Sequence, residues 1–308
     1  MSARASAAPT TAPQNDTAVG TDTSQIRAAY PDGWRRIGTV REKRIAILFH
    51  ERQREQRLPL YAIHYLSEFW RADGLEVVHL FGVEELVPAD VVVVHVDTSV
   101  VPDEYLEFAR RYPVAINARV SDIRKSSFST LRVTRDSDYA GPVIVKSDLN
   151  YAGVPERMVG ESRGIATPFG APAEYPVYER IAHVPGCFFD SPEFIVERFV
   201  PERDNGLYHV RLLDFLGDRY TCVRVSAEHH VVGVASQVGY EQVTPSPEVF
   251  EVRRRLKLDY GKIDYVMYGS TPIVLDVNKT MGAGNVTAPD DLRAMRRHRA
   301  EGIYAFLS

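Results

Sequence analysis

Two aspartates and an asparagine in the last third of the chain have the types and spacing of a metal site. The segment 261–278 alternates apolar and polar residues on both sides of a turn at 269–271, which predicts a β-hairpin. With that turn Asp264 lies opposite Asp276, and directly opposed Cβ atoms are about 4.5–5.5 Å apart. Asn278 follows Asp276 by two residues and therefore points to the same face of its strand.

Two facing carboxylates repel each other unless a positive charge lies between them. Mg²⁺ takes hard oxygen ligands and is usually held by one or two carboxylates together with the phosphates of a substrate. The alternative is that both aspartates are solvent-facing residues of an edge hairpin, since such alternation is common on surface strands. The spacing alone leaves both interpretations open.

A parallel αβ domain is predicted over residues 43–120. Short apolar runs predict buried strands, and helical periodicity predicts a helix after Pro59 and another from Pro102 to Arg111. Strands that are apolar throughout and alternate with helices form parallel sheets covered on both faces. The predicted strands are 44–49, 75–80, 90–95 and 113–116.

Polar side chains follow two of these strands where each ends. Ligands of such sheets bind beyond the carboxyl ends of the strands. His50, Glu51, His95 and Asp97 are therefore candidate substrate contacts by topology, although a histidine at a strand end is commonly a packed structural residue.

The chain after residue 120 has a different pattern. Short strands with hairpin-type turns at Asn205-Gly206 and Gly217-Asp218 predict antiparallel sheets, with late helices at 247–256 and from Asp290. The fold class is thus α/β plus α+β. The predicted strands are 142–146, 194–197, 209–213, 220–225 and 231–234. Residues 1–25, rich in Ala, Pro, Ser and Thr, form a predicted disordered tail, and 26–42 an adaptor.

Composition narrows the class of protein. With 44% hydrophobic residues, 25% charged residues and a net charge of −4, the chain is typical of globular proteins and lacks the charge of a duplex nucleic-acid binder. No apolar run approaches the roughly 18 residues of a membrane helix, and no signal peptide is evident, so a cytoplasmic protein is expected. Cys187 and Cys222 are expected to be free thiols, and the arginines at 253–255 and 296–299 to lie on solvated helix faces.

The predicted hairpin and the segments before it resemble the ATP-grasp superfamily, which includes D-alanine–D-alanine ligase, the ribosomal-protein glutamate ligases and the biotin carboxylases. That family has a strand with a metal-binding Asp, a short turn, and then Glu-x-Asn. Here Asp264 stands at the first position and Asp276-Val-Asn278 at the second, with Asp for the usual Glu. Lys-Thr-Met-Gly282 follows in place of Asn-x-x-Pro-Gly.

The resemblance implies a fold in which the αβ domain (43–120) precedes a small subdomain (121–200) and a C-terminal subdomain (201–308), whose antiparallel sheets clamp a nucleotide. It implies Mg²⁺ at Asp264, Asp276 and Asn278. Two lysines would contact phosphates, and Glu197 and the backbone after it would bind adenine. Asp204, or alternatively Glu202, would bind the ribose hydroxyls. The implied ATP contacts are Lys125, Lys146, Asn150, Gly153, Glu197, Phe199, Val200, Glu202 and Asp204.

Family members activate a carboxylate as an acyl phosphate, which an amine then displaces. The resemblance implies such a ligase, with Arg211 and Lys262 stabilising the transferred phosphoryl group. The alternatives are a phosphotransferase that stops after the first transfer and a nucleotide-binding module without turnover. The implied partners are a small carboxylate and a nucleophile, with no nucleic acid or membrane; a homodimer is the expected form if the chain self-associates.

Overall fold

The computed structural model describes residues 43–55, 61–160, 175–232, 236–283 and 290–307. The predicted tail (1–25) and adaptor (26–42) lie outside these residues. Three β-sheets carry the described part of the chain, and each falls within one of the three predicted domains.

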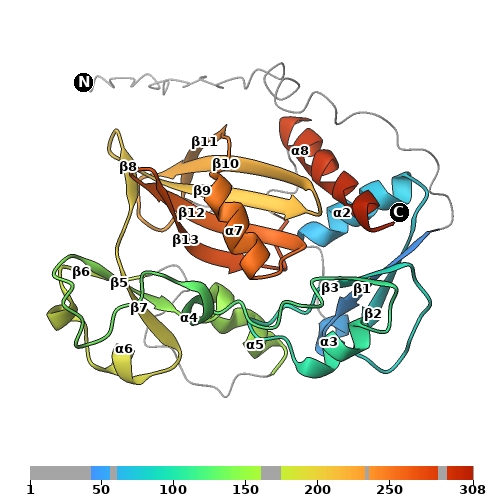
Figure 1. The fold of residues 1–308 in the computed structure, drawn as a ribbon, viewed down its shortest axis with the longest axis horizontal. Helices are drawn as coiled ribbons and strands as arrows, with labels where there is room; N and C mark the ends of the chain where they lie inside the picture. Colours follow the sequence, from blue (N-terminus) through green and yellow to red (C-terminus); the bar gives the residue numbers. More distant parts are fainter. Residues whose placement is uncertain (1–42, 56–60, 161–174, 233–235, 284–289, 308) are drawn as a thin grey trace, which may run out of the picture. The chain divides into compact units, whose positions relative to one another are not determined.

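The first sheet is parallel, as predicted, and its strands lie in the order β2-β1-β3-β4. β1, β2 and β3 are labelled in Figure 1. Its central strand β1 is apolar throughout because both of its faces are buried. Ile45, Ile47 and Phe49 belong to one hydrophobic cluster, and Ala46 and Leu48 to another. The strands are β1 (Arg44–Phe49), β2 (Glu76–Phe81), β3 (Val91–Val94) and β4 (Val114–Ile116).

A helix covers each face of this sheet. Helix α2 (Ala62–Ala72) buries Leu66 and Trp70 in the first cluster, while α3 (Asp103–Ala109) packs in the second. A 3₁₀ turn, η1 (Glu51–Glu55), follows β1. Residues 56–60, where the first helix was expected to begin, lie outside the described residues.

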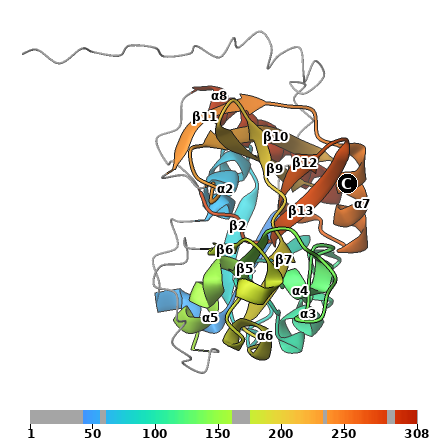
Figure 2. The same cartoon turned by 90° about the vertical axis from the view of Figure 1, so that its left-hand side faces the viewer.

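The second sheet is small and antiparallel, with the order β6-β5-β7. Its strands are β5 (Val143–Ser147), β6 (Val177–Tyr178) and β7 (Phe194–Arg198). Short helices surround it; α4 lies close to β13 of the next sheet (Figure 2). They are α4 (Lys125–Phe128), η3 (Asn150–Gly153), α5 (Val154–Met158), η4 (Ile181–His183) and α6 (Cys187–Asp190).

The third sheet is antiparallel, with the order β11-β10-β9-β12-β13 and β8 paired to β9. Helix α7 (Pro247–Arg255) covers one face, and α8 (Asp290–Ala300), beside α2 in Figure 1, packs on β9 and β10. A final 3₁₀ segment, η5 (Glu301–Phe306), follows α8. The strands are β8 (Glu202–Asp204), β9 (Leu207–Leu216), β10 (Arg219–Ala227), β11 (Gln237–Gln242), β12 (Tyr260–Tyr268) and β13 (Thr271–Asn278).

The two faces of this third sheet differ in chemistry. Under α7 lie Leu213, Phe215 and Tyr265, which form a buried core. Residues of opposite parity, including Leu212, Asp214 and Asp264, occupy the other face, which we call the open face. The open face is therefore where the third sheet can present polar groups.

The predicted strand at 231–234 was wrong. Val231 and Val232 are irregular, 233–235 lie outside the described residues, and the edge strand is β11 instead. Val231 and Val232 line a cavity and do not belong to a strand, so an apolar run here marks a cavity wall and not a buried strand.

The hairpin turns predicted at Asn205-Gly206 and Gly217-Asp218 are confirmed. Asn205 and Gly206 join β8 to β9 with φ of 49° and 83°, the left-handed pair that a two-residue hairpin turn requires.

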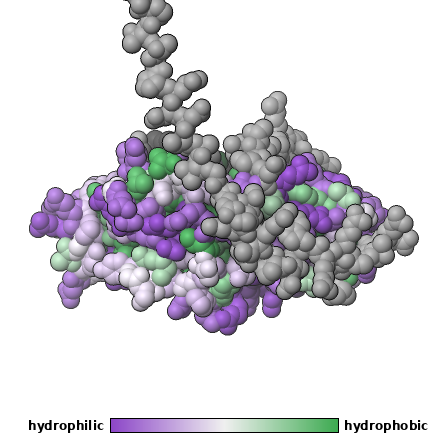
Figure 3. Space-filling model, turned by 90° about the horizontal axis from the view of Figure 1, so that it is seen from above, coloured by the Kyte–Doolittle hydropathy of each residue, from purple (hydrophilic) through white to green (hydrophobic). Residues whose placement is uncertain are grey.

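Cys187 and Cys222 are free thiols. None of the helices in the described ranges is long and apolar enough to span a bilayer. Seen from above, the coloured surface is mostly hydrophilic with scattered hydrophobic residues (Figure 3).

Three histidines lie around Phe49 in the parallel sheet. The centroids of the His64, His79 and His95 rings are 6.1, 5.4 and 5.1 Å from that of Phe49. Burial, with the neighbouring His64 and Arg71, lowers the pKa of His79 to about 4. Burial likewise lowers the pKa of His64 and, more strongly, that of His95. The folded chain therefore holds these rings neutral.

We expect acid to destabilise the fold through these histidines. The unfolded state binds more protons between the folded pKa of His79, about 4, and the ordinary histidine pKa of 6.5, so stability is lost as pH falls through this window. For half-buried His79 the expected loss between pH 7 and pH 5 is about 1 kcal/mol after allowance for screening. Urea unfolding at both pH values should show a smaller loss in His79→Phe than in the wild type; equal losses would contradict this account.

Candidate functional site

The hairpin of β12 and β13 brings Asp264 opposite Asp276, the predicted pairing, by an unexpected route. The turn has two residues rather than three, because Tyr268 already pairs with Thr271. That register alone would misalign the aspartates. A β-bulge at Leu275 adds the missing residue, so that Asp264 faces Asp276.

Positive charges flank both carboxylates. Lys262 Nζ donates to Asp264 Oδ2 at 2.9 Å, and Lys125 Nζ lies 3.0 Å from Asp276 Oδ1. Burial, with the nearby charge of Asp276, raises the pKa of Asp264 to about 6, although Lys262 opposes the rise. Burial lowers the pKa of Lys262, but Asp264 and Asp214 outweigh that effect and raise it overall. At Lys125, burial lowers the pKa but Asp276 outweighs that effect, so both lysines are charged beside the aspartates.

The donors at the hairpin fit a Mg²⁺ ion that completes its shell with other oxygens. Asp264 Oδ1 is buried and has no hydrogen-bond partner within the described part of the chain. Asn278 Oδ1 accepts from the Thr280 N–H at 2.7 Å, which orients the amide but occupies part of its oxygen. No cluster of three His, Cys, Asp or Glu exists among the described residues. The three hairpin residues would therefore supply only part of a coordination shell, as is usual for Mg²⁺.

A cavity of about 170 Å³ lies between the small sheet and the third sheet. Six of the candidate residues predicted from the sequence line this cavity, and they come from segments far apart in the chain. These are Lys125, Lys146, Phe199, Val200, Asp264 and Asp276. The lysines and aspartates share this cavity with apolar residues, among them Ile144, Val266 and Leu275.

Lys146 and Glu197 form a buried ion pair at the edge of the cavity. Their Nζ and Oε2 atoms are 2.7 Å apart, and the side chains are 9% and 1% exposed. The pairing of β5 with β7 places Glu197 opposite Ile144, two residues before Lys146. Glu197 therefore holds the ammonium group of Lys146 toward the cavity that this lysine lines.

One wall of the cavity is aromatic. His230 packs edge-on against Phe199, with ring centroids 5.7 Å apart, and its Nε2 lies 2.8 Å from the carbonyl oxygen of Tyr175. Tyr208 and Val200 complete the wall. Sequence reasoning missed Tyr175, Tyr208 and His230, because no local pattern signals residues that meet only when two sheets face each other.

Arg211 and Glu202 lie elsewhere. Arg211 pairs in register with Tyr265, on the face covered by α7, whereas Asp264 pairs with Leu212 on the open face. The Arg211 guanidinium donates twice to Glu202, at 3.1 and 2.9 Å, and Glu202 also accepts from Arg224. The structure therefore does not bring the nominated catalytic Arg211 to the aspartates, and Glu202 is engaged away from the cavity. Nor does the nominated ribose contact Asp204 line the cavity; it is an exposed residue at the end of β8.

The remaining nominated residues gather at the carboxyl edge of the parallel sheet. Asn150 donates its N–H to Ser99 Oγ at 2.8 Å, and Gly153 (φ 69°) ends a left-handed turn. His50 is buried against Tyr105, and Glu51 is exposed. None of these four lines the cavity between the small and third sheets, and neither does the fully buried His95.

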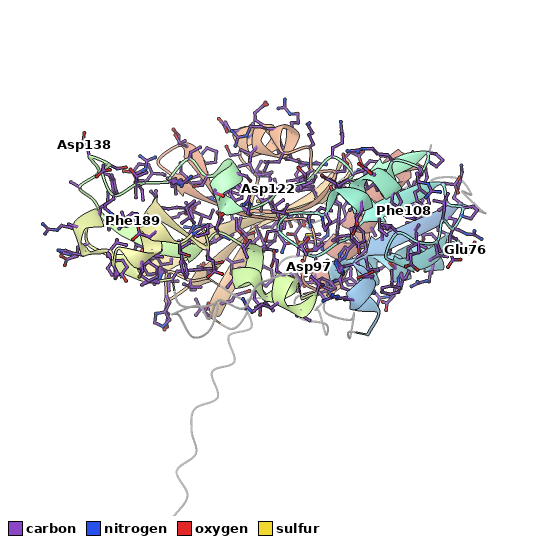
Figure 4. The ribbon with its side chains drawn as sticks, turned by 90° about the horizontal axis from the view of Figure 1, so that it is seen from below. Glu76, Asp97, Phe108, Asp122, Asp138 and Phe189 are labelled. Carbon is purple, nitrogen blue, oxygen red and sulfur yellow. The ribbon has the colours of Figure 1, made fainter. Side chains whose placement is uncertain are left out.

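Asp97 instead links the parallel sheet to the third sheet. It accepts from Tyr61 Oη at 2.6 Å and from Thr280 Oγ1, while Lys279 Nζ donates to the carbonyls of Val96 and Thr98. Figure 4 places Asp97 near the middle of the molecule, between Glu76 and Phe189. These hydrogen bonds hold the end of β13 at the end of β3.

Asn117 fastens the other strand of the hairpin. Its side chain donates to Tyr260 O at 2.7 Å and accepts from the N–H groups of Asp259 and Tyr260. This buried residue adopts φ of 61°, an unusual value that the surrounding bonds maintain. Both strands that carry the aspartates therefore start or end at the edge of the parallel sheet.

The Lys146–Glu197 pair makes a prediction about stability. Glu197→Gln keeps the shape of the side chain but leaves a buried ammonium without its counter-charge, so the free energy of unfolding should fall by about 3 kcal/mol. The control is Arg254→Gln, which removes an ion pair to Glu251 whose side chains are 68% and 63% exposed, and should cost less than about 1 kcal/mol. Urea unfolding measures both, and equal losses would show that the buried pair has no special weight.

No protein-family model matches this sequence, and neither does any curated protein. The structure is similar to that of the RimK domain protein ATP-grasp from Sphaerobacter thermophilus DSM 20745, at 15% identity and a TM-score of 0.47, over 86% of this chain and 99% of that one. It is similar to D-alanine–D-alanine ligase from Bacillus anthracis at 13% identity and a TM-score of 0.48, over 86% and 96%. It is also similar to the macrocyclase MdnC bound with precursor peptide MdnA from Microcystis aeruginosa MRC, at 10% identity and a TM-score of 0.45, over 84% and 98%. At these values the likeness is one of general architecture, and substrate and activity must be argued from this chain's own residues.

Proposed function

We propose that this chain is an ATP-dependent ligase that activates a carboxylate as an acyl phosphate and joins it to an amine. The observation that carries the proposal is that one cavity is lined by Lys125, Lys146, Asp264 and Asp276. Cations for phosphates and oxygen ligands for a divalent metal are the two things that a bound nucleoside triphosphate requires.

The two lysines would bind the phosphates of ATP. Both side chains are buried, and each is oriented by a carboxylate, Asp276 for Lys125 and Glu197 for Lys146. A compact ammonium group on a flexible stem suits phosphate oxygens. The aromatic wall of Phe199, Tyr208 and His230, together with Val200, suits the flat apolar faces of the adenine ring.

Asp264, Asp276 and Asn278 would hold Mg²⁺, which when bound neutralises phosphate charge. The raised pKa of Asp264 agrees with this role, because two carboxylates at close range with an unsatisfied oxygen favour a cation between them.

The chemistry needs two displacements. A carboxylate oxygen attacks the γ-phosphorus, the bond from that phosphorus to the bridging oxygen of ADP breaks, and the electron pair leaves with ADP. An amine nitrogen then attacks the acyl carbon, the carbon–oxygen bond to phosphate breaks, and a proton leaves the nitrogen. We assign to Lys262, rather than to Arg211, the stabilisation of the transferred group, because its Nζ lies on the open face beside Asp264.

Nucleotide binding is the first test. Calorimetry should give micromolar ATP affinity that requires Mg²⁺ and that falls about tenfold or more in Lys146→Ala and in Asp276→Asn, since each removes a charge that faces the triphosphate. Arg254→Gln, on the exposed side of α7, is the control and should bind like the wild type. ATP affinity that does not depend on Mg²⁺, or that is unchanged in both variants, would refute the site.

Trapping with hydroxylamine separates the activities. A ligase should give ADP, free phosphate and a hydroxamate from a carboxylate, because hydroxylamine intercepts the acyl phosphate. A phosphotransferase would give ADP and a stable phosphorylated product without free phosphate. Tight ATP binding with no turnover across a broad carboxylate panel would favour a nucleotide-binding module. This alternative is considered because Asp276 stands where the family usually has Glu.

The cytoplasmic location, the small-molecule partners and a homodimer remain predictions of the sequence. So do the domain boundaries at 120 and 200.

A further inference from the structure

A second cavity of about 700 Å³ lies on the open face of the third sheet, beneath α8. It adjoins the first cavity at the hairpin, because Lys262 lines the second, Asp264 lines the first, and their side chains are 2.9 Å apart. We infer that this second cavity binds the carboxylate substrate and that the substrate has a large hydrophobic body. This inference rests on the proposed ligase function and specifies its substrate class.

The floor of the second cavity is apolar. Leu212 pairs in register with Val223, and Val225 follows on the same face of β10. Leu212 and Val223 belong to none of the hydrophobic clusters of the core, which on this sheet lies under α7. Val238, on β11 at the rim, is 55% exposed. Such a strip of aliphatic side chains on an open sheet face suits a hydrocarbon body and offers nothing to a short polar acid.

The end of the cavity nearest the hairpin is cationic. Lys262 pairs in register with Asp214, and Arg299 binds the same Asp214 at 2.7 Å as well as Thr221 at 3.1 Å. Arg296 lies over the ring of Tyr65, whose hydroxyl accepts from Arg299. Lys262, Arg296 and Arg299 outnumber the two carboxylates beside them, Asp214 and Asp264, and this excess of positive charge favours an anionic head group at this end.

Charge and shape together orient the substrate. Its carboxylate would lie by Lys262, next to Asp264 and the γ-phosphate, and its hydrophobic body would extend over Leu212, Val223 and Val225 toward β11. The buried Arg299, whose side chain is 5% exposed, corrects the expectation that the arginines at 296–299 form a solvated helix face. The covalent step is the one given above, in which a substrate carboxylate oxygen displaces ADP.

The test compares carboxylates of different body in the presence of Mg-ATP and hydroxylamine. We expect kcat/KM for octanoate and 3-phenylpropanoate to exceed that for acetate and succinate by about tenfold or more, since each methylene added to an apolar pocket contributes severalfold. Calorimetric titration with octanoate alone gives a readout that does not depend on turnover.

Two substitutions probe the floor. Val223→Asp and Val238→Asp place a charge on the path of the hydrocarbon body, and each should lower kcat/KM for octanoate by about tenfold while Mg-ATP affinity stays within about twofold. Val238 is exposed, so its variant should fold even if the Val223 variant does not. Tyr268→Ser removes another exposed hydrophobic residue, at the hairpin turn outside the cavity, and is the matched control.

The outcomes separate the two proposals. A preference for acetate or succinate, or unchanged octanoate kinetics in a folded Val238→Asp, would overturn the inference and leave the ligase standing. Octanoate binding that the substitutions weaken, in a protein that binds no Mg-ATP, would overturn the ligase function. Preference for octanoate that falls in the floor variants but not in Tyr268→Ser would support both.

Discussion

The site depends on two carboxylates that face each other across one hairpin. Asp264 and Asp276 would repel each other in a buried setting without nearby positive charge. Two lysines from different parts of the chain supply it, Lys262 from the same strand as Asp264 and Lys125 from α4. Lys125 reaches Asp276 from α4, a helix of the small-sheet region that lies against β13 and also packs Phe128 into the core of the third sheet. An ion pair and hydrophobic packing together link the two sheets that enclose the first cavity.

A second set of bonds fixes where the hairpin sits. Asn117 holds the start of β12, and Thr280 with Lys279 holds the end of β13, all at the carboxyl edge of the parallel sheet. These are buried polar contacts with several partners each, and they resist small displacements because every broken bond would leave a buried group unsatisfied. The parallel sheet thus positions the hairpin from outside, even though the residues nominated at that edge do not line the first cavity.

The strengths and failures of sequence reasoning have separate physical causes. The parallel sheet follows from continuous apolar strands such as β1, and the turn at Asn205-Gly206 from residues that tolerate positive φ. The facing of Asp264 and Asp276 was obtained with the wrong turn, since a bulge at Leu275 compensates for the shorter loop and leaves no clear mark in composition. Val231 and Val232 appeared to be a strand because hydrophobicity alone cannot separate a sheet residue from a cavity wall.

The sequence by itself determined most of the element types, the antiparallel hairpin and the kinds of groups available for phosphate and metal chemistry, because these depend on local periodicity and residue type. Only the tertiary structure decided which groups meet. Arg211 lies one residue from the face it was expected to share, and alternation along a strand sends it to Glu202 on the other side. Arg299, at the end of a charged helix, is buried by a partner 85 residues away in the sequence. Contacts between distant segments depend on register and packing, which no local pattern encodes.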